Sequence, residues 1–114
     1  DQPERVIVAE IIREKLLWHL NQEVPHGIAV SVEQMKEREG SELIDIDAVI
    51  YCERESHKGI IIGKRGSMLK AVASEARVDI ERFLSAKVNL QWWVKDKEDW
   101  RNREGLIRSL GLDS

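Results

Sequence analysis

Hydrophobic and polar positions alternate along this chain with two different periods, and each change of period marks the boundary of an expected element. Apolar side chains recur every three or four residues over about residues 3–20, which predicts a helix. Its expected buried stripe is Val8, Ile11, Ile12, Leu16 and Leu20. The same spacing over residues 67–86 predicts a second long helix. Its expected apolar face is Leu69, Val72, Ala73, Ala76, Ile80, Phe83 and Leu84.

Elsewhere the period falls to two, which is typical of strands with one buried face. Such alternation starts at Ile28 and recurs over residues 44–52 and 88–94. A turn at residues 39–42 joins the first two strands and predicts an antiparallel hairpin. Helical sequence separates the second strand from the third, and such a crossover normally makes two strands parallel. We therefore expect an α+β fold with a three-stranded mixed sheet and the helices on one face. Asp99 predicts the start of a short C-terminal helix that runs to about Leu110.

The length of 114 residues predicts one domain. Cys52 is the only cysteine, so no disulfide is possible within the chain, and a reducing cytoplasm is the expected compartment. The longest apolar run, residues 48–52, is far shorter than the roughly 20 residues of a membrane span. The three histidines lack the spacing of metal ligands, and we expect no metal site. Asp45 and Asp47 fall on the polar face of a strand, which indicates solvation and not a catalytic pair.

Charge is distributed unevenly along the chain. The net charge of −3 argues against binding to nucleic acid, because such proteins usually carry a basic surface. Yet residues 1–56 hold 6 basic and 13 acidic side chains, whereas residues 57–114 hold 12 basic and 8 acidic ones. Within residues 57–70 four basic side chains occur without any acid, namely Lys58, Lys64, Arg65 and Lys70. One local patch is therefore strongly positive.

The most informative segment is residues 59–69, with the sequence Gly-Ile-Ile-Ile-Gly-Lys-Arg-Gly-Ser-Met-Leu. A nucleotide-binding Walker loop needs four residues between its glycines and a Ser or Thr after the lysine, and the segment fails both tests. It could be a buried strand followed by a plain turn. It could also be a basic loop whose two glycines let a sugar-phosphate backbone approach main-chain N–H groups at the start of a helix.

Residues 62–69 resemble the I-G-x-x-G-x-x-[IL] core of a KH domain, whose loop clamps single-stranded nucleotides. The expected order of elements is similar to the type II, prokaryotic arrangement, α-β-β-α-α-β. Residues 1–5, 11–15, 24–26, 53–56, 58–63, 75–77 and 93–95 resemble the C-terminal part of the bacterial Era GTPase family. The GTPase domain of that family has no counterpart here, so we expect a KH fragment of a longer protein.

The resemblance implies binding of 16S ribosomal RNA near its 3′ end, in support of 30S subunit assembly. The expected RNA-binding residues are Lys58, Ile61, Ile62, Gly63, Lys64, Arg65, Gly66, Ser67 and Lys70. It also implies an N-terminal GTPase domain as partner, with GTP and Mg²⁺ bound only there, so this chain is not itself an enzyme. The implied location is the cytoplasm, with peripheral contact at the inner face of the cell membrane. The rival hypothesis is a protein-interaction module that uses the same fold without RNA.

The chain departs from the family's sequence pattern at two places. Arg65 replaces a glycine that many relatives carry, which predicts a stiffer and more basic loop. Residues 72–74 read Val-Ala-Ser where relatives often have Ile-Gly. The packing under the long helix is therefore expected to differ slightly. Residues 60–62 favour a strand by propensity, but the family predicts a short helix over residues 56–62. Among the tryptophans, Trp18, Trp92 and Trp100 are expected to pack, and Trp93 is expected to be exposed or covered by another part of the protein.

Overall fold

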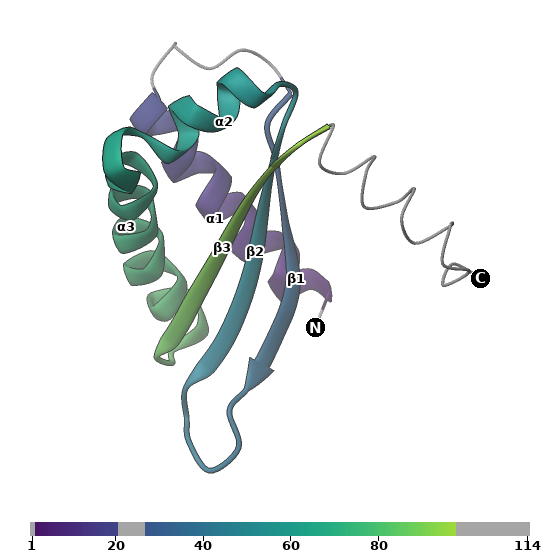
Figure 1. The fold of residues 1–114 in the computed structure, drawn as a ribbon. Coiled ribbons are helices and arrows are strands. Elements are labelled where there is room, and N and C mark those ends of the chain that lie inside the picture. The colour runs from purple at the N-terminus through teal and green to yellow at the C-terminus, as the bar shows by residue number, and fades with distance from the viewer. Residues whose placement is uncertain (1, 21–26, 98–114) are drawn as a thin grey trace, which may run out of the picture.

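The computed structural model describes residues 2–20 and 27–97, and its chain order confirms the expected α-β-β-α-α-β arrangement (Figure 1). The elements are α1 (Gln2–Leu20), β1 (Ala29–Glu37), β2 (Ile44–Cys52), α2 (Glu55–Ile62), a 3₁₀ turn η1 (Lys64–Gly66), α3 (Ser67–Leu84) and β3 (Val88–Asp96). The predicted C-terminal helix and Trp100 lie outside the described residues. No described helix is long and apolar enough to cross a membrane.

The sheet has the order β1-β2-β3 and is mixed, as expected. β1 pairs antiparallel with β2, and β2 pairs parallel with β3 after the crossover through α2 and α3. An irregularity between Val32 and Gln34 shifts the register of β1 by one residue. Because this bulge restores the alternation, Val32 and Met35 both lie opposite core residues of β2, namely Ala48 and Ile46.

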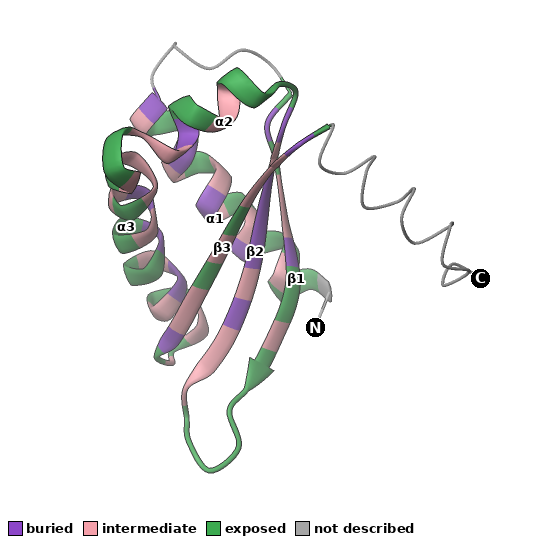
Figure 2. Cartoon of the chain, in the orientation of Figure 1, coloured by how far each residue is buried: buried purple, intermediate pink, exposed green. Residues whose placement is uncertain are grey.

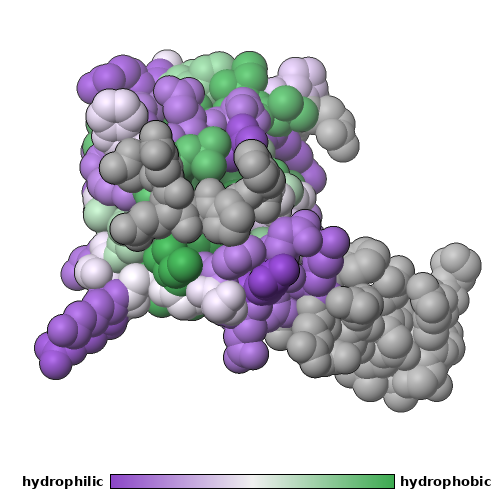
Figure 3. All heavy atoms as spheres, turned by 90° about the horizontal axis from the view of Figure 1, so that it is seen from above, coloured by the Kyte–Doolittle hydropathy of each residue, from purple (hydrophilic) through white to green (hydrophobic). Residues whose placement is uncertain are grey.

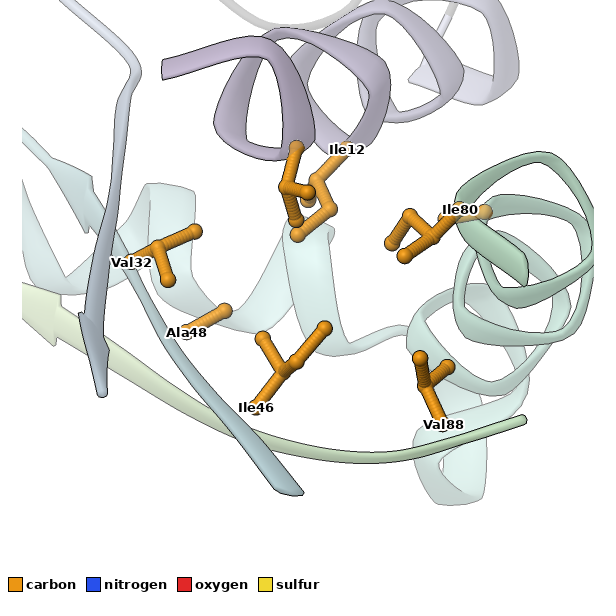
Figure 4. Packing of buried hydrophobic residues seen from close by; sticks show 8 residues of the cluster. Ile12, Val32, Ile46, Ala48, Ile80 and Val88 are labelled. Atoms are coloured by element: carbon orange, nitrogen blue, oxygen red, sulfur yellow. The ribbon is translucent and has the colours of Figure 1, made fainter. Parts of the chain in front are cut away.

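Two adjoining clusters form the core between the helices and one face of the sheet. In the first, Ile12 of α1 and Ile80 of α3 converge on Ile46 of β2, and all three are fully buried (Figure 4). The second lies toward α2 and contains Leu16, Leu20, Ile28, Ile50, Cys52, Ile61 and Val72. Burial therefore follows the inner faces of α1, α3 and the sheet, while their outer faces are largely exposed (Figure 2). The segment around α2 is thus anchored to the same core as the long helices.

Several expected core positions are wrong in detail. Trp18 is 79% exposed, because it lies on the side of α1 away from the buried stripe, and Phe83 is 41% exposed although it shares the apolar face of α3, in the last turn of that helix. Val49 is buried although it alternates away from the helices. The long helix ends at Leu84 and not at residue 86, because Ser85 adopts a left-handed conformation with φ 53°. Residues 60–62 are helical, so the family-based expectation was right and the strand propensity was overruled.

One ion pair and one histidine–carboxylate hydrogen bond join α1 to α3 outside the core. The Lys15 Nζ lies 2.8 Å from Asp79 Oδ2, and His19 Nε2 lies 2.7 Å from Glu75 Oε2. The hydrogen bond from Lys15 lowers the pKa of Asp79, and the same bond raises the pKa of Lys15. These contacts fix the position of α3, the helix that follows the glycine loop.

A third carboxylate, Asp45 on β2, links the hairpin to β3. It accepts hydrogen bonds from Arg38 and from the Asn89 side chain, and these bonds lower its pKa. A carboxyl whose pKa is lower in the folded state contributes stability above its unfolded value near 4 and loses it as pH falls through the folded value. We therefore expect Asp45→Asn to lower stability at pH 7 and to flatten its decline below about pH 4. Denaturant unfolding at neutral and acid pH measures both; equal acid sensitivity of the two proteins would contradict this assignment.

Candidate nucleic-acid interface

The segment that joins α2 to α3 has an unusual backbone. Gly63 has φ 78° and ψ 175°, a region that glycine alone adopts freely. Arg65 (φ 57°) and Gly66 (φ 74°) are both left-handed. Backbone bonds brace the turn, since the Gly63 N–H donates to the Gly59 carbonyl and the Gly66 N–H donates to the Gly63 carbonyl. Three positive φ values within four residues make a tight loop, which we call the 63–66 loop.

The close approach of α3 explains why position 63 must be glycine. An added Cβ there would lie 2.5 Å from the Met68 Cβ and 2.7 Å from the Met68 backbone nitrogen. Real Cβ atoms do not approach backbone atoms so closely, and backbone cannot move aside as a flexible side chain can. At Gly66 an added Cβ would meet nothing within 4 Å, so that glycine is needed for its conformation and leaves open space beside the loop.

The start of α3 faces the same open space. Gly66 precedes the helix as its N-cap, and no side chain caps it. The first N–H groups of a helix lack partners within it and carry the positive end of the helix dipole. Such an end attracts anions, and the 63–66 loop leads directly into it.

Two adjacent cations occupy the tip of the loop. Lys64 and Arg65 are both exposed, and neither makes an ion pair within the part of the chain that the structure describes. Ser67 and Lys70 on the first turns of α3 are also exposed. The structure thus brings together five of the expected residues around one surface: Lys64, Arg65, Gly66, Ser67 and Lys70. Lys58 is half-buried and already engaged in an interaction, so it is a weaker candidate.

The isoleucines of α2 differ from the expectation in which of them are buried and which are exposed. Ile61 is fully buried in the second core cluster, so the expectation that it contacts RNA is wrong. Ile62 is half-buried. Ile60, which the sequence reasoning did not select, is 37% exposed. Three consecutive isoleucines look equivalent in sequence, and only the 100° turn per residue of a helix separates the buried one from its neighbours.

The surface above α2 combines apolar and polar side chains. Figure 3 shows this end of the molecule from above, with hydrophobic side chains gathered between hydrophilic ones. Two hollows elsewhere are lined by other residues and include none of the 63–66 loop. Because its tip residues Lys64 and Arg65 are exposed, the loop suits a chain-like ligand better than an enclosed small molecule. No cluster of three or more potential metal ligands occurs among the described residues.

Neither tryptophan of β3 gives a stacking platform beside the loop. Trp92 packs partly buried against both core clusters, as expected. Trp93 is 45% exposed and alternates to the outer face of the sheet, next to Val49 of β2. Base stacking on Trp93 would therefore require RNA on the face of the sheet opposite the helices, away from the 63–66 loop.

Comparison with known proteins identifies the family. Residues 23–101 match the KH domain family. The chain is 61% identical over 113 residues to GTPase Era of Alkaliphilus oremlandii and 59% identical to GTPase Era of Clostridioides difficile. Each alignment covers 99% of this chain and 38% of the relative, so the chain spans well under half the length of these proteins.

Two solved structures are similar throughout the chain. One is Aquifex aeolicus Era bound to GDP·AlF₄⁻, with a TM-score of 0.79 and 38% identity; the match covers all of this chain and 38% of that one. The other is Era in complex with MgGDPNP and nucleotides 1506–1542 of 16S ribosomal RNA, with a TM-score of 0.77 and 38% identity. That match covers 96% of this chain and 37% of the other. The chain therefore belongs to the KH domain family, and its relatives within that family are the KH domains of GTPase Era.

Proposed function

We propose that this domain binds single-stranded RNA through the 63–66 loop. The observation that carries the proposal is the pair of exposed cations, Lys64 and Arg65, which have no acidic partner among the described residues and lie between two glycines at the uncapped start of α3. Gly66 leaves open space where a side chain would keep a phosphate away from the backbone, and Gly63 lets the loop pack closely against Met68. The cations and the helix end then supply positive charge where a phosphate would lie.

The bases of the bound strand are proposed to lie along α2. Ile60 and Ile62 expose apolar surface there, and an unstacked base can pack its flat face against such side chains. Ser67 can donate its hydroxyl to a phosphate oxygen, and Lys70 extends the positive charge by about one turn of α3. Ile61 contributes only by anchoring α2 to the core.

The proposed target is ribosomal RNA near the 3′ end of the 16S molecule, in support of 30S subunit assembly. The similarity to an Era structure that contains nucleotides 1506–1542 of 16S ribosomal RNA supports this choice. The similarity to longer GTPase Era proteins further supports a protein that also carries a GTPase domain, with GTP and Mg²⁺ bound there. We place such a protein in the cytoplasm, with peripheral contact at the membrane.

Fluorescence anisotropy tests the RNA target. A single-stranded RNA that copies the 16S 3′ tail should bind more tightly than a scrambled strand of equal composition. Three to four phosphate contacts should give a slope of about −2 to −3 for log affinity against log salt concentration. Equal affinity for the two strands would contradict the proposed specificity for ribosomal RNA. Absence of binding to either would favour a KH fold that acts as a protein-interaction module.

Arg65 is proposed to strengthen RNA binding through its charge while its left-handed backbone lowers the stability of the fold. A residue with a Cβ in the left-handed region costs about 1 kcal/mol relative to glycine. We expect Arg65→Gly to stabilise the fold by up to about 1 kcal/mol and to weaken RNA binding several-fold. Urea unfolding and anisotropy on the same variant measure the two effects. If Arg65→Gly is less stable than the unaltered chain, or binds RNA as tightly, this role of Arg65 is contradicted.

A further inference from the structure

A hollow of about 960 Å³ lies at the opposite end of α3 from the 63–66 loop. The start of α1, the turn between β1 and β2, and the end of α3 surround it. α3 has 18 residues, so its two ends are separated by roughly 27 Å at 1.5 Å per residue. A ligand in this hollow would therefore leave the loop free.

The floor of the hollow is apolar. Met35, Ile44 and Leu84 line it, and each is half-buried against the first core cluster. They form the end of the core, where the two long helices stop short of the turn between β1 and β2. Apolar surface at the bottom of a hollow gains stability when a further apolar side chain covers it.

The rim of the hollow is predominantly acidic. Its charged residues are Glu4, Glu37, Glu42, Glu81, Arg82 and Lys87, four acids against two bases. Glu81 accepts a hydrogen bond from the Val88 N–H, and Arg82 lies 3.8 Å from Asp79. Glu37 and Glu42 are exposed and make no ion pair with any described residue. Two carboxylates on the hairpin are thus free to meet an external cation.

We propose that this hollow docks a protein segment that carries an apolar side chain flanked by lysines or arginines. The apolar side chain would cover Met35, Ile44 and Leu84, and the flanking cations would pair with Glu37 and Glu42. The same carboxylates repel phosphate, so the occupant is a protein and not a nucleic acid. The domain can then hold a basic protein segment at one end while the loop at the other end remains available.

Amide chemical shifts of the 114-residue chain test the proposal with a defined probe, a short synthetic peptide of alternating lysine and leucine. The largest shifts are expected at Met35, Glu37, Glu42, Ile44 and Leu84. A peptide with serine in place of leucine should bind about tenfold more weakly, since each leucine loses its apolar contact. Shift changes spread over all of residues 1–56, the acidic half of the chain, would overturn the proposal. Equal affinity for the serine and leucine peptides would also overturn it.

Charge reversal distinguishes binding of the peptide in the hollow from general attraction of a basic peptide to an acidic protein surface. The double variant Glu37→Lys/Glu42→Lys should bind the lysine–leucine peptide about tenfold more weakly, because attraction becomes repulsion at two rim positions. The matched control is Glu14→Lys/Glu33→Lys, which makes the same change of net charge at two exposed residues that do not line the hollow. Equal losses in the two variants would overturn the proposal. Affinity for RNA at the loop is a separate readout and is expected to fall in neither variant.

Discussion

Replacing both Lys64 and Arg65 with aspartate is expected to lower affinity for single-stranded RNA by about 100-fold or more. Each charge-assisted hydrogen bond to a phosphate contributes about 1.5–3 kcal/mol, and the substitutions remove two and add repulsion. Both side chains are exposed and neither supports the core, so the melting temperature should change little. Anisotropy with the 16S 3′ tail measures the affinity, and circular dichroism measures the melting.

A matched variant shows whether the position of the charges matters. Lys36→Asp/Arg77→Asp makes the same change of net charge at exposed residues of β1 and α3 that do not belong to the loop. We expect this control to weaken RNA binding less than tenfold, through long-range repulsion alone. If the control loses as much affinity as the loop variant, RNA is attracted by the general charge of the domain and the loop is not the binding site.

The second large effect is expected at Gly63. An alanine there would place its Cβ 2.5 Å from the Met68 Cβ and would force a side chain into a glycine-only backbone region. Overpacking and backbone strain each cost about 1–3 kcal/mol, so Gly63→Ala should lower the free energy of unfolding by about 2–6 kcal/mol. That is a large part of the stability of a small domain. Urea unfolding measures the loss, and RNA affinity should fall with the distorted loop.

Gly59 supplies the control for this substitution. It lies one turn earlier in α2, has ordinary helical backbone, and would place an added Cβ in open space. Gly59→Ala should therefore stabilise the domain by about 0.5–1 kcal/mol, the usual gain in a helix interior. Similar effects of the two substitutions, in either direction, would show that the contact with Met68 does not constrain the loop.

The sequence predicted the elements well because their signals are periodic and repeated. The stripe of α1 and the face of α3 each recur over four or five turns, so a single misplaced residue such as Phe83 does not change the conclusion. The hairpin and the parallel crossover follow from the turn residues and from general rules of chain connection, and the structure confirms both. The glycine loop was found because two glycines and two cations occur together in sequence.

Details that depend on three-dimensional neighbours were not predictable. Ile60 and Ile61 are identical in sequence, yet one is 37% exposed and the other fully buried, because only the docking of α2 selects which side faces the core. The exposure of Phe83 and the bulge after Val32 depend in the same way on packing. The acidic hollow combines residues from α1, the hairpin and α3, and no local pattern in the sequence indicates that they meet.

The most direct test of the central claim is a map of amide chemical shifts during titration with a single-stranded RNA that copies the 16S 3′ tail. If RNA binds at the 63–66 loop, the largest changes are expected at Lys64, Arg65, Gly66 and Ser67, with smaller ones along α2 and none at the turn between β1 and β2. Changes centred on that turn or on the outer face of the sheet near Trp93, with the 63–66 loop unaffected, would contradict it.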